Sequence, residues 1–205
     1  NGEILSYASS PSFDPNKFVE GVSKDYWQEL NNDPRKPLSN KPISAIYPPG
    51  STFKLMVALA GLEGGINPKH RVTCNGSYHL GKRVFHCWKD GGHGSVDMMD
   101  AIMGSCNTYF FTIANQMGYE KFTEMARKFG YGEKLDISLY GARSGNVPND
   151  EWKKKVFKIP WVGGDTLNTA IGQGFVLATP LQMALITARI ANGGVPIKPY
   201  LVRNH

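Results

Sequence analysis

A proline-stiffened loop that leads into a helix constrains this chain more than any other feature. In Tyr47–Lys54, two prolines and a glycine precede Ser51 and Lys54, and apolar residues then follow at helical spacing. Prolines disfavour helix in the residues before them, so we expect the helix to begin at or near Ser51. Residues three apart share one helical face. The sequence therefore predicts a serine hydroxyl and a lysine amine one turn apart at a helix start.

This pair has two interpretations. Serine is a favoured helix cap and most lysines lie on surfaces, so both residues can be structural. Alternatively, Ser51 is a nucleophile, because backbone N–H groups at a helix start can stabilise the oxyanion that its attack creates. Partial burial would then lower the pKa of Lys54 and allow it to act as the general base.

A second polar element lies further along the chain. Ser105 and Asn107 flank Cys106, and apolar residues at helical spacing follow. Ser51-x-x-Lys54 followed by Ser105-x-Asn107 resembles the signature of the penicillin-binding serine acyltransferases. Neither motif is specific alone, but their order matches that family.

The resemblance covers nearly the whole chain. Residues 1–16 are similar to the first strand and turn of a class B penicillin-binding transpeptidase domain, and residues 143–148 and 172–184 are similar to its later landmarks. The elongation-type branch of class B is the most similar. The resemblance implies the α+β fold of the penicillin-binding and serine β-lactamase proteins, here mostly its helical part with little of its antiparallel sheet.

The third element of the family, Lys-Thr-Gly or Lys-Ser-Gly, does not occur in this sequence. In the family it lies on a strand that lines the other side of the cleft, downstream of where this sequence ends. We therefore expect residues 1–205 to be part of a transpeptidase domain, with a cysteine-bearing insert at 70–107. The membrane anchor, the pedestal and the Lys-Thr-Gly part are expected outside it, which leaves the activity of residues 1–205 alone in doubt.

The resemblance implies a peptidoglycan D,D-transpeptidase. Ser51 attacks the D-Ala-D-Ala end of a stem peptide, Lys54 takes its proton, and Ser105 relays a proton to the departing D-alanine. Asn107 holds the amide of the incoming peptide or of a β-lactam side chain. A neighbouring stem amine then converts the acyl-enzyme into a crosslink. The same resemblance implies β-lactams as ligands, cell-shape and cell-wall elongation proteins as partners, and the periplasmic face of the bacterial inner membrane as the location.

Two rival functions stay open. D,D-carboxypeptidases and serine β-lactamases use the same elements but transfer the acyl group to water. From a different class, the chain is a non-catalytic interaction module of a cell-wall complex.

The chain carries a net charge of +6, part of it in the basic run at residues 153–158. Such a run is either a solvated face or a contact with an anionic membrane surface or polymer. Nucleic acid is not expected as a partner, because no nucleic-acid-binding motif accompanies the charge.

The cysteines suggest a metal centre. Cys74, Cys87, His93 and Cys106 follow one another at intervals of 13, 6 and 13 residues, and three thiolates with one imidazole suit structural zinc. His86 could replace His93 as the nitrogen ligand. The alternatives are a Cys74–Cys87 disulfide with Cys106 free, or three unlinked cysteines. Some relatives of the elongation-type branch carry a metal near the active site at corresponding positions, which supports zinc.

A metal bond to Cys106 would fix the backbone from which Ser105 and Asn107 project. Four protein ligands would leave no open position, so the zinc would be structural.

The remaining secondary structure follows from hydrophobic spacing and turn signals. We expect a strand near residues 3–8, a short helix within 18–30, a hairpin within 72–84, helices at 96–117, 120–129 and 180–191, and a long loop ending at Thr166.

Overall fold

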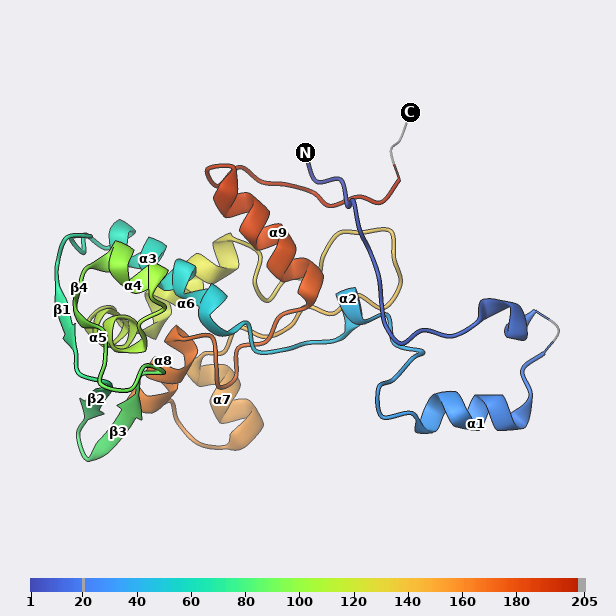
Figure 1. The fold of residues 1–205 in the computed structure, drawn as a ribbon, viewed down its shortest axis with the longest axis horizontal. Helices are drawn as coiled ribbons and strands as arrows, with labels where there is room; N and C mark the ends of the chain where they lie inside the picture. The colour runs from blue at the N-terminus through green and yellow to red at the C-terminus, as the bar shows by residue number, and fades with distance from the viewer. Residues whose placement is uncertain (20, 203–205) are drawn as a thin grey trace. The chain divides into compact units, whose positions relative to one another are not determined.

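Helices make up most of the secondary structure of the computed structural model, which describes residues 1–19 and 21–202 (Figure 1). Within these residues the strands are short and form two antiparallel two-stranded sheets. The predicted α+β class, with the helical part predominant, is confirmed. None of the helices in the described ranges combines the length and apolarity that a membrane crossing requires.

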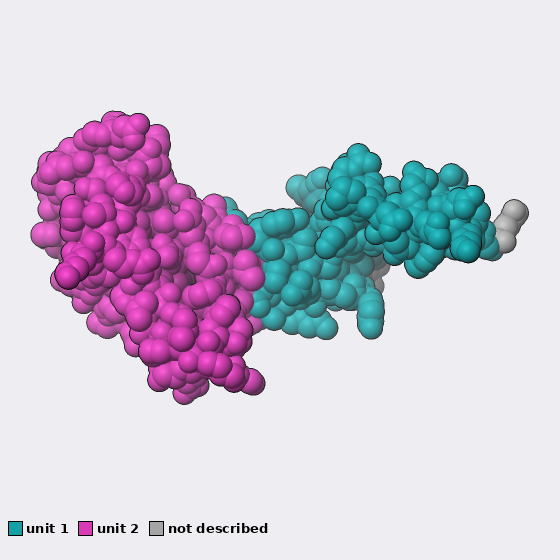
Figure 2. All heavy atoms as spheres, turned by 90° about the horizontal axis from the view of Figure 1, so that it is seen from below, with its two compact units in different colours: residues 1–47, 133–145, 179–205 teal, residues 48–132, 146–178 magenta. Residues whose placement is uncertain are grey.

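The chain divides into two units, coloured separately in Figure 2. Unit 1 consists of residues 1–47, 133–145 and 179–205, and unit 2 consists of residues 48–132 and 146–178. Unit 2 contains the sheets and every residue that the sequence predicts as catalytic or metal-binding.

The helices of unit 2 enclose a hydrophobic core. They are η2 (Gly50–Phe53), α3 (Lys54–Glu63), α4 (Met98–Met103), α5 (Asn107–Met117), α6 (Tyr119–Lys128), α7 (Asp150–Phe157) and α8 (Gly163–Ala170). α3 packs against α5 and α6, and α5 packs against α8. Phe53 is fully buried, and its ring makes edge contacts with Phe122 and Tyr131. Burial of such a side chain stabilises the fold by about 1.5–3 kcal/mol.

The two small sheets lie in the cysteine-bearing segment. β1 (Val72–Cys74) pairs with β4 (Gly94–Val96), and β2 (Ser77–Leu80) forms a hairpin with β3 (Arg83–His86). The hairpin predicted within 72–84 therefore lies a few residues later, at 77–86. The first predicted strand, β1, pairs instead with β4, so that Cys74 lies opposite Gly94, the residue that follows His93.

The single helix predicted at 96–117 is wrong, because it is interrupted between α4 and α5. Gly104 ends α4, and Ser105 adopts a left-handed backbone conformation with φ of 51°. A helix cannot continue through such a residue. The apolar spacing runs across the break, so the hydrophobic pattern alone does not reveal it.

The loop predicted up to Thr166 is also wrong, since it contains α7 and the first half of α8. α7 has an ordinary cap, in which the Asn149 side chain accepts a hydrogen bond from the Trp152 backbone. α8 opens with Gly163 and Gly164, residues of low helix propensity that conceal its start.

Unit 1 contains η1 (Pro15–Phe18), α1 (Lys24–Asn32), α2 (Lys41–Ser44) and α9 (Pro180–Ala191), with α2 packed against α9. α9 matches the helix predicted at 180–191, and the Thr179 and Gln182 side chains form its capping box. Among the residues that the structure describes, the segment predicted as a strand near residues 3–8 makes only one parallel bridge, between Glu3 and Tyr200.

Candidate active site and metal centre

Ser51 lies in a tight turn directly before α3. The turn is a 3-10 helix that begins at Gly50, and the α-helix itself begins at Lys54. The Gly50 backbone N–H donates a hydrogen bond of 2.8 Å to the Gly172 carbonyl. Gly172 has a φ of 71°, and a Cβ atom there would lie 2.0 Å from the Gly50 carbonyl oxygen. Only glycine allows this close approach, so Gly172 fixes the turn that carries the exposed Ser51 hydroxyl.

Lys54 is almost fully buried, with only 2% of it exposed. Its Nζ donates to the Ser105 carbonyl oxygen at 2.8 Å, to Ser105 Oγ at 2.9 Å and to Asn107 Oδ1 at 2.7 Å. Burial lowers the pKa of Lys54 to about 8, while the nearby Cys87 and Cys106 sulfurs act in the opposite direction. An amine with this pKa has a substantial neutral fraction near neutral pH, as a general base requires.

Ser105 connects the lysine to the first serine. Its Oγ donates a hydrogen bond of 2.8 Å to Ser51 Oγ and accepts one from Lys54 Nζ. The break between α4 and α5 turns the Ser105 side chain toward α3. The structure thus brings Ser51, Lys54, Ser105 and Asn107 into one hydrogen-bonded group, which has the geometry to move a proton from Ser51 toward Lys54.

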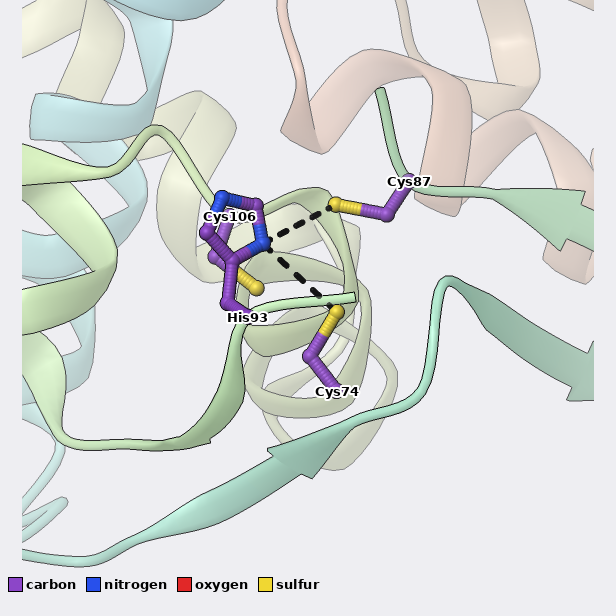
Figure 3. Close-up of side chains that lie close together, drawn as sticks. All are labelled: Cys74, Cys87, His93 and Cys106. Carbon is purple, nitrogen blue, oxygen red and sulfur yellow. Dashed lines mark hydrogen bonds between the residues drawn. The ribbon is translucent and has the colours of Figure 1, made fainter. Parts of the chain in front are cut away.

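The three cysteines and His93 converge on one point beside this group. Cys74 ends β1, and Cys87 directly follows β3. His93 directly precedes β4, and Cys106 directly precedes α5. Figure 3 shows the four side chains pointing toward one another. Their ligand atoms all lie within 4.8 Å of one another.

The donor set fits a tetrahedral metal ion. His93 Nδ1 lies 3.5 Å from Cys87 Sγ and 3.7 Å from Cys74 Sγ. Ligands of a tetrahedral zinc ion with ordinary Zn–S and Zn–N bonds are separated by about 3.3–3.8 Å. His93 Nε2 lies 3.0 Å from the Gly104 carbonyl oxygen. A proton on Nε2 would complete that hydrogen bond and leave the Nδ1 lone pair for the metal, a common arrangement of metal-binding histidines.

The thiols differ in acidity. For Cys74, burial raises the pKa, but hydrogen bonds with the Thr108 hydroxyl and with His93 outweigh this and lower it to about 6. Burial raises the pKa of the Cys106 thiol to about 12. All three cysteines are free, so the predicted alternative of a Cys74–Cys87 disulfide is not formed in this structure.

The sequence analysis also named residues that lie elsewhere, and it missed one. His86 is exposed and is not part of the cluster, although its backbone carbonyl accepts a hydrogen bond of 3.3 Å from Asn107 Nδ2. Trp88 was missed: its indole N–H lies 3.1 Å from each of the Gly104 and Ser105 carbonyl oxygens. Nothing in its sequence context beyond its place next to Cys87 indicates this contact.

The basic run at residues 153–158 is not one solvated face. Lys153 is buried and forms an ion pair with Asp165. Lys154 is largely exposed and pairs with Asp150, one turn earlier in α7.

Comparison with known proteins places these observations in a family. Residues 1–205 match the penicillin binding protein transpeptidase domain. The chain is 42% identical over 205 residues to the peptidoglycan D,D-transpeptidase MrdA of Acinetobacter baumannii, a match that covers 98% of this chain and 30% of that protein. The chain therefore spans about a third of the length of the curated relatives it matches.

Two solved structures are similar throughout. The penicillin-binding protein PBP2 of Helicobacter pylori, in complex with MreC, matches with a TM-score of 0.96 and 40% identity, covering 100% of this chain and 39% of that one. Pseudomonas aeruginosa PBP2, in complex with WCK 5153, matches with a TM-score of 0.93 and 39% identity, covering 99% of this chain and 47% of that one.

Proposed function

This chain belongs to the family of penicillin-binding protein transpeptidase domains, and from that premise we propose that its protein is a serine peptidoglycan D,D-transpeptidase. The observation that carries the proposal is the continuous set of hydrogen bonds from Ser51 through Ser105 to Lys54 and Asn107. If Ser51 only capped a helix and Lys54 only lay on the surface, the Lys54 amine would not need to be buried with three hydrogen-bond acceptors beside Ser51.

In the proposed reaction, Ser51 Oγ attacks the penultimate carbonyl of a D-Ala-D-Ala stem peptide. Its proton passes to the neutral amine of Lys54, directly or through the Ser105 hydroxyl, and then to the leaving nitrogen of D-alanine. The product is an ester between the shortened stem and Ser51. The amine of a second stem attacks this ester, forms the crosslinking amide and returns the proton to Ser51.

Asn107 has a double role in this proposal. Its Oδ1 accepts from Lys54 Nζ and so holds the amine in place, while its Nδ2 donates to the His86 carbonyl. These two hydrogen bonds keep the amide in a fixed orientation. The Ser51 backbone N–H, in the first turn of η2, is the proposed oxyanion donor from this chain.

We further propose that Cys74, Cys87, His93 and Cys106 bind a structural zinc ion. The donor chemistry, the separations of 3.5 and 3.7 Å and the second hydrogen bond of the His93 ring support this assignment. Zinc would crosslink the ends of β1 and β3 to the segment before α5. Residues 70–107 would then be a metal-stabilised insert of the transpeptidase domain.

The relatives support the proposed partners, and the family resemblance supports the proposed location. The structure of the H. pylori relative is a complex with MreC, and the crystal structure of the P. aeruginosa relative is a complex with WCK 5153. We propose that the protein containing this chain likewise assembles with cell-wall elongation proteins, is acylated by β-lactams and works at the periplasmic face of the inner membrane.

Labelling with a fluorescent penicillin tests the proposal in the full-length protein. We expect one covalent label, mapped by mass spectrometry to Ser51 and lost in Ser51→Ala. An unlabelled wild-type protein would refute the acyl-enzyme mechanism and favour the non-catalytic interaction module, whereas a label on another residue would refute Ser51 as the nucleophile.

A second assay identifies the acceptor. Incubation with a D-Ala-D-Ala stem peptide and an amine-bearing stem should give the crosslinked dimer. If the only product is the shortened stem, the protein is a carboxypeptidase instead.

A further inference from the structure

The segment His86–Trp88 contacts each residue of the Ser105–Asn107 segment. The His86 carbonyl accepts a hydrogen bond from Asn107 Nδ2, and Cys87 and Cys106 both belong to the group of candidate metal ligands. The Trp88 indole N–H is shared between the carbonyl oxygens of Gly104 and Ser105, at 3.1 Å from each. We propose that Trp88 is a positioning residue for acylation: its indole N–H holds the Ser105 backbone so that the Ser105 hydroxyl and Lys54 amine meet Ser51. This inference rests on the proposed acyltransferase function.

The Ser105 backbone needs such a contact. Its φ of 51° lies in the left-handed region, which is unfavourable for a residue other than glycine. The Ser105 carbonyl oxygen accepts hydrogen bonds from both Trp88 Nε1, at 3.1 Å, and Lys54 Nζ, at 2.8 Å. Two donors on one carbonyl oxygen fix the orientation of the peptide group. Without the indole, only the Lys54 ammonium would hold it, and that contact weakens when Lys54 loses its proton to act as a base.

Trp88 is placed by the metal centre rather than by the core. Trp88 is 63% exposed, so burial contributes little to holding its side chain in place. Its ring packs edge-on against the His93 imidazole, with 5.4 Å between ring centroids, and its backbone directly follows Cys87. Two of the four candidate metal ligands therefore flank the indole. The indole N–H therefore links the four candidate metal ligands to the Ser105 carbonyl, in addition to the direct chain connection from Cys106 to Ser105.

The test is Trp88→Phe in the full-length protein, which keeps an aromatic ring and removes the N–H. The matched control is Trp161→Phe, since the Trp161 indole also donates one hydrogen bond in unit 2, to Thr166 Oγ1 at 2.9 Å, but has no contact with Ser105. Stopped-flow acylation by fluorescent penicillin separates the initial binding constant from the rate constant of acylation. Metal content and thermal unfolding are measured on the same samples.

We expect Trp88→Phe to lower the acylation rate constant about 3- to 10-fold, the value of one lost hydrogen bond, with the initial binding constant, zinc content and melting temperature close to those of Trp161→Phe. An acylation rate constant equal to that of Trp161→Phe would overturn the inference and leave the proposed function intact. A loss of zinc or a larger drop in melting temperature in Trp88→Phe would also overturn it, because the role would then be structural. If the wild-type protein is not acylated at all, the proposed function fails, and this inference fails with it.

Discussion

The two sides of the candidate site are held by different forces. Ser51 and Lys54 stand at the start of α3, whose inner face belongs to the hydrophobic core, and Phe53 between them is completely buried. Ser105 and Asn107 stand at a break between two helices, and polar contacts from the cysteine-bearing segment support them. Packing of apolar side chains does not depend on a bound metal or on pH. A cluster of sulfur ligands depends on the metal, and hydrogen bonds to an amine depend on pH. The proposed nucleophile, Ser51, thus lies on the side held by core packing (the robust side), and the proposed proton relay, Ser105, lies on the side held by polar contacts (the sensitive side).

Replacement of Lys54 is expected to have the largest effect. Lys54→Met keeps a long side chain in the buried position and removes the amine that joins the two sides. Acylation by fluorescent penicillin should fall about 10²- to 10⁴-fold, the usual contribution of a general base. Lys128→Met is the control, since that lysine is exposed and lies on α6. A loss of less than tenfold in Lys54→Met, with the fold intact by circular dichroism, would remove Lys54 from the proposed mechanism.

The turn that carries Ser51 can be displaced by a substitution that changes no polar side chain. Gly172→Ala places a Cβ 2.0 Å from the Gly50 carbonyl oxygen, so the turn that carries Ser51 must shift. A displacement of about 1 Å can cost on the order of 10²-fold in rate. Gly65→Ala is the control, because Gly65 has a φ of 81° but nothing within 4 Å of the added Cβ. Acylation kinetics measure the difference, and equal rates in the two variants would show that the Gly50–Gly172 contact does not position Ser51.

Removal of the metal should affect only the sensitive side. After chelation, hydrogen exchange is expected to speed up in residues 74–107, while the amides of α3 keep their protection. Acylation should slow by on the order of tenfold, because metal binding orients the supporting groups but supplies no reacting atom. Added zinc should restore both signals. Equal loosening of α3, or no bound metal in the purified protein, would contradict the proposed division between the two sides.

The sequence predicts these two sides unequally. The Ser51–Lys54 geometry depends on residues three apart in one turn, so local spacing suffices. The four candidate metal ligands are also predicted as a set, because few residue types offer a donor atom to zinc. The break at Ser105 is not, since the apolar spacing continues across it, although Gly104, the residue before it, is a signal for a helix end. The Trp88 contact is missed because a long-range hydrogen bond to a backbone carbonyl has no sequence pattern.

The secondary structure outside the candidate site shows the same limit. The capping box of α9 is local, and this helix is predicted with its correct ends. The pairing of β1 with β4 and the glycine-led start of α8 depend on tertiary contacts that outweigh local propensity.

The pH dependence of acylation is the smallest predicted effect, and it links the two sides. The pKa of Lys54 is lowered from 10.5 to about 8, chiefly by burial. If the neutral amine is the base, the acylation rate should rise about tenfold from pH 7 to pH 9 and reach half of its plateau near pH 8. The same shift has a consequence for stability. The folded state binds fewer protons than the unfolded state between about pH 8 and 10.5, so the contribution of Lys54 to stability increases as the pH rises through that window.

Metal removal should move this midpoint upward. The buried position of Lys54 depends partly on Ser105 and Asn107, and loosening of their segment admits water to the amine and reduces the desolvation that lowers its pKa. The measurement is the pH–rate profile of fluorescent penicillin acylation with and without chelator, and Lys128→Met should leave both profiles unchanged. A flat profile between pH 6 and 10 would show that Lys54 is not the base. A midpoint that stays near pH 8 after chelation would show that burial in the core alone sets the pKa of Lys54. The candidate metal ligands would then affect only the positions of Ser105 and Asn107.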